Sequence, residues 1–336
     1  MKGLKEMSYN KYLFPSTVVI EPTNVCNLHC KMCSAKCSTQ KNIIKQDLTP
    51  ENLEIMLEKL KGYIVNIAFQ GDCEPTLNKN LKDLVKVASK YTEEISLVSN
   101  GTMLTENLVD ELIDNGLSLF SISIDDYIPE KYNSIRVGSD FNKVIKNIDY
   151  ITKLKKEKNK NIKTLVHKVV FPEDTIEHIK QYIKFFSDEH SIDKITIAPL
   201  AMNFKIKEWV LFRNNLENEF MDNDIYLNLR DYENYPYRSA HKYYCGTNLF
   251  FIDVFGDLKA CPLHSGSPKK FGNLLTESLE EIAQNKCFKE YHEFWLEKRF
   301  SNCLPEMCND CFLLKGDYYG YCLDEGVNEI NIFKKI

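Results

Sequence analysis

The sequence predicts an α/β fold: a partial (β/α)6 barrel followed by a small C-terminal domain made of a β-hairpin plus helices. From Val18 to Pro199, short apolar runs of strand length alternate with amphipathic helical patterns. Beyond Pro199 this alternation stops, and hairpin and cysteine patterns replace it. Strict alternation is typical of a parallel sheet covered by helices, and six units are fewer than the eight of a closed TIM barrel.

The alternating region contains six predicted strands and five predicted helices. Thr49 before Pro50 indicates a helix N-cap with proline at the first helical position, and Asn115-Gly116 indicates a helix end. The strands are expected at residues 18–20, 64–69, 95–98, 117–124, 164–171 and 194–198. The helices are expected at residues 50–61, 81–91, 106–115, 141–155 and 175–187.

The last third of the chain has a different pattern. We expect a charged helical connection at 203–223 and an irregular stretch at 224–244. A hairpin with strands at 249–254 and 258–261 and a turn at 255–257 then precedes helices at 278–284 and 287–298. The predicted division is an N-terminal extension, a barrel, a connecting segment, a C-terminal domain and a tail, at residues 1–15, 16–202, 203–240, 241–325 and 326–336.

Composition excludes several classes of protein. The 336 residues include 43 lysines and arginines against 48 aspartates and glutamates, a net charge of −5 that does not favour nucleic-acid binding. No apolar stretch approaches the roughly 20 residues of a membrane-spanning helix, and the N-terminus lacks the apolar core of a secretion signal. We therefore expect a cytoplasmic protein with no membrane partner.

The twelve cysteines fall into two groups, with none between Cys73 and Cys245. In a chain of this size without a secretion signal, clustered cysteines favour metal binding over disulfides. The first group contains Cys26, Cys30 and Cys33 within eight residues, directly after the first predicted strand.

Three thiolates at this spacing favour a [4Fe–4S] cluster that keeps one iron without a protein ligand. A substrate or cofactor can bind at such an open iron. The alternative is zinc, which requires a fourth ligand, and His29 or Cys37 is a candidate for it. Spacing alone leaves both metals open, with His29 expected to face away from the metal.

The segment from Glu21 to Cys33, EPTNVCNLHCKMC, resembles the C-x3-C-x2-C signature of radical S-adenosylmethionine (SAM) enzymes. The resemblance implies that the open iron chelates SAM and that an electron from the reduced cluster cleaves it. The products are methionine and a 5′-deoxyadenosyl radical, which removes a hydrogen atom from a substrate. Members usually have an aromatic residue before the third cysteine. Met32 stands there and is expected to pack on the adenine.

Further segments match the family in the same order. Residues 69–75, FQGDCEP, resemble its G-G-E-P segment, with Cys73 where glycine is usual. Ser121, Ser123 and Asp125 share one strand face, which suggests contact with a polar ligand. Arg136 matches the arginine that pairs with the SAM carboxylate, although by itself an arginine there favours a surface ion pair. The SAM contacts implied by the resemblance are Met32, Gly71, Cys73, Glu74, Ser99, Asn100, Ser123 and Arg136.

The second cysteine group resembles the SPASM/Twitch extension of these enzymes, because ten residues separate Cys245 from Gly256 in the motif C-x(9–15)-G-x4-C. The resemblance implies one auxiliary [4Fe–4S] cluster, with Cys303 and Cys322 as possible replacements for an assigned ligand, and zinc as the alternative metal. The assigned auxiliary ligands are Cys245, Cys261, Cys308 and Cys311.

These features predict an enzyme that oxidises, cross-links or otherwise modifies a peptide, a protein or a small molecule such as an aminocyclitol. The first strand begins near Val18, which slightly disfavours a preceding leader-peptide recognition domain. An electron donor such as flavodoxin or ferredoxin is the expected protein partner. The general acid or base is not identifiable. The competing hypothesis is a non-catalytic, zinc-stabilised binding protein.

Overall fold

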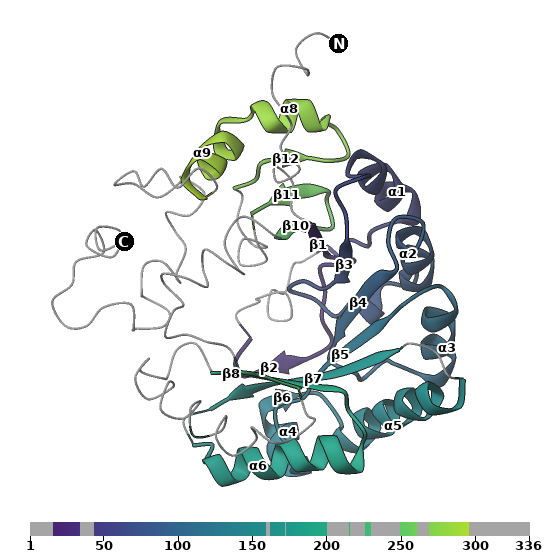
Figure 1. Cartoon of the computed structure of the whole chain (residues 1–336), viewed down its shortest axis with the longest axis vertical. Helices are drawn as coiled ribbons and strands as arrows, with labels where there is room; N and C mark the ends of the chain where they lie inside the picture. The colour runs from purple at the N-terminus through teal and green to yellow at the C-terminus, as the bar shows by residue number, and fades with distance from the viewer. Residues whose placement is uncertain are drawn as a thin grey trace, which may run out of the picture.

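The computed structural model of the chain describes residues 16–33, 44–158, 162–171, 173–199, 215, 226–229, 249–260 and 269–295. Within them, ten strands form one sheet in the order β12-β11-β10-β1-β3-β4-β5-β7-β8-β9. Among the described strands, β12 and β9 stand at the two ends of this order and do not pair with each other, so the described sheet is open (Figure 1). This architecture confirms a partial barrel.

The six predicted strands are all present and parallel to their predicted neighbours. They are β1 (Thr17–Ile20), β3 (Asn66–Phe69), β4 (Glu94–Ser99), β5 (Leu119–Ser123), β7 (Lys163–Val170) and β8 (Lys194–Pro199). Because neighbouring strands run the same way, their carboxyl ends meet at one edge of the sheet. The loops at that edge carry the motifs described below.

The five predicted helices are confirmed as α1 (Pro50–Lys59), α2 (Leu81–Ala88), α3 (Glu106–Asp114), α5 (Phe141–Lys158) and α6 (Ile176–Lys184). A π turn (Phe185–Glu189) continues α6, and a 3-10 turn (Pro75–Leu77) follows β3. The Thr49 side chain caps α1 by accepting the Asn52 N–H at 3.2 Å. Helices α1, α2, α3 and α5 line the outside of the curved sheet (Figure 1).

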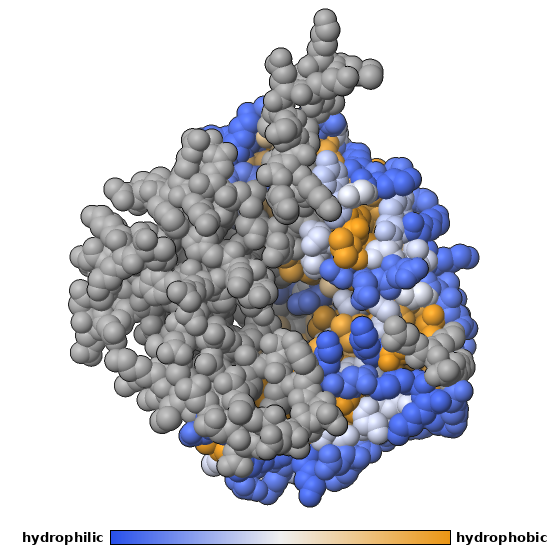
Figure 2. Space-filling view, in the orientation of Figure 1, coloured by the Kyte–Doolittle hydropathy of each residue, from blue (hydrophilic) through white to orange (hydrophobic). Residues whose placement is uncertain are grey.

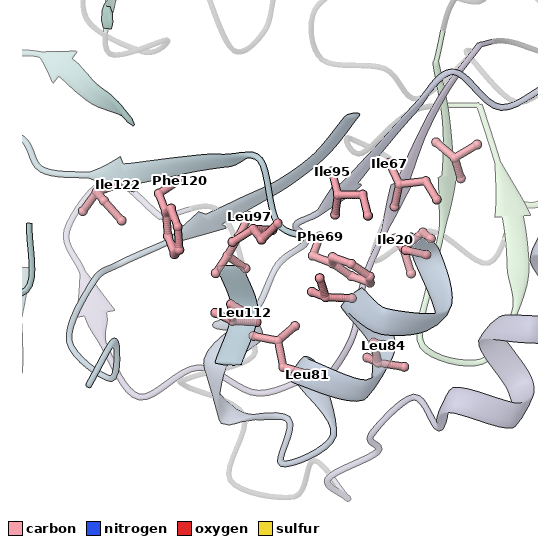
Figure 3. Packing of buried hydrophobic residues seen from close by; sticks show 14 of the residues in the cluster. Ile20, Ile67, Phe69, Leu81, Leu84, Ile95, Leu97, Leu112, Phe120 and Ile122 are labelled. Atoms are coloured by element: carbon pink, nitrogen blue, oxygen red, sulfur yellow. The ribbon is translucent and has the colours of Figure 1, made fainter. Parts of the chain in front are cut away.

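The hydrophobic core lies between the sheet and these helices. Ile67 and Phe69 of β3 and Leu97 of β4 are fully buried, and they face Leu84 of α2 and Leu112 of α3 (Figure 3). Burying an aliphatic side chain of this size contributes roughly 1.5–3 kcal/mol, so this layer fixes the position of the sheet.

Several elements of the described residues were not predicted. A strand, β9 (Tyr226–Leu229), pairs in parallel with β8, so the prediction of an irregular stretch at 224–244 is wrong there. Its four residues are too few for a recognisable period, and the free edge of β8 supplies the hydrogen bonds. The helix α4 (Pro129–Ile135) spans seven residues. The two-residue strands β2 (His29–Cys30) and β6 (Arg136–Val137) form a second sheet.

The predicted hairpin is confirmed as β10 (Leu249–Ile252) and β11 (Asp257–Lys259). A strand β12 (Gly272–Asn273) and the predicted helices α8 (Leu279–Gln284) and α9 (Lys286–Trp295) follow. Strand β10 also pairs in parallel with β1, so these elements continue the barrel sheet. We call residues 249–260 and 269–295 the C-terminal segment. The predicted domain limits themselves stay a prediction.

The hairpin turn shows why Asp253, Gly256 and Asn273 occupy their positions. Asp253 Oδ1 accepts the N–H groups of Phe255 and Asp257, each at 3.0 Å. Gly256 has a φ of 84°, which favours glycine. Asn273 Nδ2 donates to the carbonyl of Phe255 at 2.9 Å and to Asp257 Oδ1 at 2.7 Å. These contacts fasten β12 to the tip of the hairpin.

The surface of the described region is mainly hydrophilic over the outer helices (Figure 2). Its large exposed hydrophobic residues are scattered along the chain at Ile44, Ile55, Val65, Met103, Ile128, Val137 and Phe255. No helix of the described residues has the length and apolar character needed to cross a membrane.

Glu21 lies where the barrel meets the C-terminal segment. Its backbone N–H donates to Ile252 at 2.9 Å, and its Oε1 accepts the Asp72 N–H at 3.1 Å. A Cβ at position 71 would come within 2.7 Å of the Glu21 side chain, so only glycine fits at Gly71. Burial, together with the nearby carboxylates of Asp72 and Asp253, raises the pKa of Glu21 to about 7.

This raised pKa predicts a pH-dependent stability. Between pH 4.5 and about 7 the folded protein binds a proton at Glu21 that the unfolded chain has lost. The free energy of unfolding should therefore fall as pH rises through this range, by up to about 3 kcal/mol from this group. Glu21→Gln should flatten the decline, measured by anaerobic urea unfolding from pH 5 to 8. Glu93→Gln, at an exposed turn position, is the control and should keep the decline.

A second contact between the barrel and the C-terminal segment predicts a loss of stability. Lys59 Nζ, at the end of α1, donates to the carbonyls of Leu274 at 2.6 Å and Glu277 at 2.8 Å. Lys59→Met should lower the free energy of unfolding by about 1–2 kcal/mol. Lys61→Met, which removes only an exposed pair with Glu58, should cost less than about 0.5 kcal/mol. Equal losses in the two variants would contradict this assignment.

Candidate active site

The cysteine loop leaves the carboxyl end of β1 and is held by a segment more than a hundred residues away. In the β2–β6 pair, Cys30 lies opposite Arg136 and His29 opposite Val137. The Lys31 N–H also donates to the carbonyl of Ile135 at 3.0 Å. The short helix α4, missed in the sequence, brings Arg136 to this place because the helix ends there.

The three cysteines of the loop lie close enough to influence one another electrostatically. Burial raises the pKa of the Cys30 thiol to about 11, and the neighbouring thiols of Cys33 and Cys26 add to the increase, while Arg136 opposes it. Burial also raises the pKa of Cys26. A metal centre binds thiolates, so loading this loop must release protons.

The donor set fits an iron–sulfur cluster better than one zinc ion. Two thiolates on one zinc, each at about 2.3 Å, are at most about 4.6 Å apart. Within the described residues, the three sulfur atoms of this loop do not all lie within 4.8 Å of one another. In a [4Fe–4S] cluster each thiolate binds a different iron, which suits this wider spread.

Arg136 is buried, with 7% of its surface exposed, and it forms an ion pair with Asp125, which lies two residues beyond the end of β5. Its Nε donates to Asp125 Oδ2 at 2.6 Å, and its Nη1 donates to Cys30 Sγ at 3.8 Å. Although burial disfavours the charged form, Asp125 and Cys30 raise the pKa of Arg136 above its ordinary value. The ion pair expected for an isolated arginine exists, but it is buried beside the cysteine loop and not on the surface.

Glu74 organises the loops after β3 and β4. Its carboxylate accepts Ser99 Oγ and the Asn100 N–H, each at 2.7 Å, and the Thr76 N–H at 3.1 Å. The Glu74 N–H donates to the carbonyl of Val25 at 2.9 Å, next to the cysteine loop. Burial raises the pKa of Glu74 while these hydrogen bonds oppose the increase. The predicted residues Glu74, Ser99 and Asn100 therefore form one connected unit.

Asn27, which the sequence reasoning did not single out, links this unit to the cysteines. Its Oδ1 accepts Asn100 Nδ2 and its Nδ2 donates to Thr102 Oγ1, both at 2.9 Å. The only signal in the sequence was its place between Cys26 and Cys30. The paired amides fix the loop after β4 against the cysteine loop.

The remaining predicted residues divide into two sets. Met32 and Ser123 are partly exposed, in the cysteine loop and at the end of β5. Cys73 is partly exposed, and burial with the nearby Glu21 and Glu74 carboxyls raises the pKa of its thiol well above the usual value. The four predicted auxiliary ligands and their two possible replacements lie outside the described residues, namely Cys245, Cys261, Cys308 and Cys311, and Cys303 and Cys322.

Sequence comparison finds relatives that are named as GTP 3′,8-cyclases. The chain is 32% identical over 212 residues to the probable GTP 3′,8-cyclase of Methanocaldococcus jannaschii, which covers 59% of this chain and 70% of that protein. It is 30% identical over 138 residues to the GTP 3′,8-cyclase of Alkaliphilus metalliredigens, covering 40% of this chain and 42% of that one. The chain therefore spans less than half of the second relative.

Solved structures share the fold over nearly the whole chain. Streptococcus suis SuiB bound to S-adenosylmethionine has a TM-score of 0.71 at 16% identity, covering 96% of this chain and 74% of SuiB. Native anSMEcpe with bound AdoMet has a TM-score of 0.66 at 21% identity, covering 96% of this chain and 95% of that chain.

Two family matches account for both cysteine groups. Residues 20–186 match the radical SAM superfamily, and residues 244–312 match the SPASM iron-sulfur cluster-binding domain. The first range contains the cysteine loop, the Glu74 unit and Arg136, and the second contains the four predicted auxiliary ligands. The chain therefore belongs to the radical SAM superfamily and carries a SPASM domain, so its cofactors are SAM and [4Fe–4S] clusters, one of them auxiliary.

Proposed function

We propose that this chain reductively cleaves SAM to a 5′-deoxyadenosyl radical and abstracts a hydrogen atom from a substrate, which is then oxidised, cross-linked or otherwise modified. The observation that carries the proposal is the β2–β6 pairing, which places Cys30 against Arg136 at the carboxyl edge of the sheet. A cluster-binding loop and a guanidinium suited to a carboxylate thereby share one site.

Each group of the site has a defined task in this proposal. Cys26, Cys30 and Cys33 hold a [4Fe–4S] cluster that, when reduced, supplies the electron for SAM cleavage. Arg136, kept charged by Asp125, binds the SAM carboxylate. Backbone and side chains of the loops after β3, β4 and β5 surround the rest of SAM, through Gly71, Cys73, Glu74, Ser99, Asn100 and Ser123, with Met32 against the adenine.

The C-terminal cysteines hold the auxiliary cluster in this proposal, with Cys245, Cys261, Cys308 and Cys311 as its four ligands. Four thiolates leave no open iron, so this cluster suits electron transfer or substrate anchoring. A flavodoxin or ferredoxin supplies the first electron.

For the substrate we favour a peptide or a protein segment. Support comes from anSMEcpe solved with AdoMet and the Kp18Cys peptide, which shares the fold over 96% of this chain and 95% of its own. A small molecule is the second candidate. The similarity to GTP 3′,8-cyclases, over 212 and 138 residues, favours a purine nucleotide among small molecules.

The cluster assignment predicts selective effects of cysteine substitutions. Wild-type protein reconstituted without oxygen should contain about eight irons and yield 5′-deoxyadenosine from SAM after reduction. Cys30→Ala should lower 5′-deoxyadenosine formation at least about a hundredfold, since the cluster loses one of its three ligands. Cys308→Ala should retain part of the cleavage. Cys287→Ala is the control, because this half-buried cysteine of α9 lies outside both ligand sets.

Metal analysis separates this enzyme from a zinc-stabilised binding protein. A colourless protein with about two zincs and no 5′-deoxyadenosine would contradict the proposal. The substrate class is tested by mass spectrometry after incubation with SAM and either peptides encoded beside the gene or GTP. A mass change in a peptide supports the favoured class, and consumption of GTP supports the second.

A further inference from the structure

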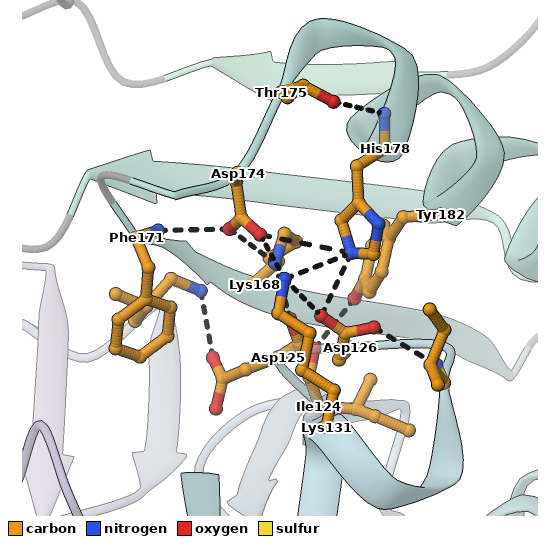
Figure 4. Close-up of polar contacts among 12 residues, drawn as sticks. Ile124, Asp125, Asp126, Lys131, Lys168, Phe171, Asp174, Thr175, His178 and Tyr182 are labelled. Atoms are coloured by element: carbon orange, nitrogen blue, oxygen red, sulfur yellow. Dashed lines mark hydrogen bonds and ion pairs between the residues drawn. The ribbon is translucent and has the colours of Figure 1, made fainter.

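Two further buried charged residues, Lys168 of β7 and Asp174, are connected to the Arg136–Asp125 pair. Lys168 of β7 is fully buried. Its Nζ donates to the backbone carbonyl of Asp125 and forms an ion pair with Asp174 Oδ2 at 2.9 Å (Figure 4). Neither Lys168 nor Asp174 belongs to a motif that the sequence analysis singled out.

Strand β7 holds Asp125 at two atoms. Lys168 fixes its carbonyl, and the neighbouring Val169 N–H donates to Asp125 Oδ1 at 2.9 Å. The other carboxylate oxygen, Oδ2, accepts Arg136 Nε at 2.6 Å. The direction of the Arg136 guanidinium therefore depends on Asp125, and the position of Asp125 depends on Lys168.

Lys168 is in turn held on several sides. The Phe171 N–H donates to Asp174 Oδ2 at 2.9 Å, which orients the carboxylate. The Tyr182 ring centroid lies 5.4 Å from Lys168 Nζ, and the Tyr182 hydroxyl donates to the carbonyl of Ile124 at 2.8 Å. Buried ion pairs often add no net stability compared with packed apolar groups of similar volume. We therefore infer that Lys168 serves to fix the geometry of Asp125 and not to increase the stability of the fold.

A second lysine shares Asp174 without reaching Asp125. Lys131 Nζ lies 2.7 Å from Asp174 Oδ1, 3.1 Å from Asp126 Oδ2 and 3.4 Å from His178 Nε2. These three groups are spaced as metal ligands would be, within 4.8 Å of one another, but the ammonium group of Lys131 already contacts all three. Lys131 thus provides a matched control for Lys168.

We propose that Lys168, supported by Asp174, is a positioning residue that acts through Asp125 to orient Arg136 toward the SAM carboxylate. This inference rests on the proposed function, since it assumes that Arg136 meets that carboxylate. It adds a requirement at β7, a strand that carries none of the predicted site residues.

The experiment measures the SAM affinity of the reconstituted, oxidised enzyme by equilibrium binding, because SAM is not cleaved in that state. It also measures 5′-deoxyadenosine formation by the reduced enzyme at saturating SAM. Lys168→Met and Asp174→Asn should each raise the Kd for SAM about tenfold, because a charge-assisted contact is lost. Turnover at saturating SAM should change less than about threefold, and iron content should stay at the wild-type value. Lys131→Met should keep the wild-type Kd. Asp174→Asn preserves side-chain size and stands in if Lys168→Met does not fold.

A double variant tests whether the effect passes through Arg136. Arg136→Met alone should weaken SAM binding, and adding Lys168→Met to it should weaken binding no further. Additive losses, or folded Lys168 and Asp174 variants with wild-type affinity, would overturn the inference. Failure of the wild-type enzyme to cleave SAM would instead contradict the proposed function, so the two failures are distinguishable.

Discussion

The two-residue pairing of His29–Cys30 with Arg136–Val137 is the contact on which the site depends. Ordering a short loop costs conformational entropy, which contacts within a loop of this length do not offset. Pairing supplies backbone partners from α4 and β6, and Asn27 adds side-chain contacts to the loop after β4. The Glu74 N–H also donates to the carbonyl of Val25, so segments that follow β3, β4 and β5 together fix the loop.

Buried charges determine the chemistry that this edge of the sheet permits. Arg136 faces Asp125 and Lys168 faces Asp174, whereas the Glu74 carboxylate accepts hydrogen bonds from Ser99 and Asn100 and has no cation among its described partners. Burying such groups costs several kcal/mol each unless they are paired. These charged groups nevertheless lie at the ends of otherwise apolar strands. Such an edge of the sheet is suited to a polar ligand that carries charges of its own. SAM, with an ammonium, a carboxylate and a sulfonium, is such a ligand.

The sequence predicted what depends on local pattern. The six predicted strands appear in the sequence as short runs rich in apolar residues, so all six were found. The cysteine spacing with the EPT and GDCEP segments identified the family. Contacts between distant segments were not predictable. Strand β10 beside β1, the β2–β6 pair and β9 arise from tertiary structure and leave no periodic signal. Asn27 and Lys168 are ordinary residue types, and only their partners reveal a role.

The pairing of β10 with β1 makes the C-terminal segment part of the barrel itself. Without β10, strand β1 would be the edge of the parallel sheet, with its backbone groups unpaired. The cysteine loop begins directly after β1, and the Glu21 N–H at that point donates to Ile252 of β10. Lys59 adds a second contact, from α1 to the residues around β12. The folding of the C-terminal segment therefore stabilises the strand from which the cysteine loop starts, because described strands of the radical SAM and SPASM ranges share one continuous sheet.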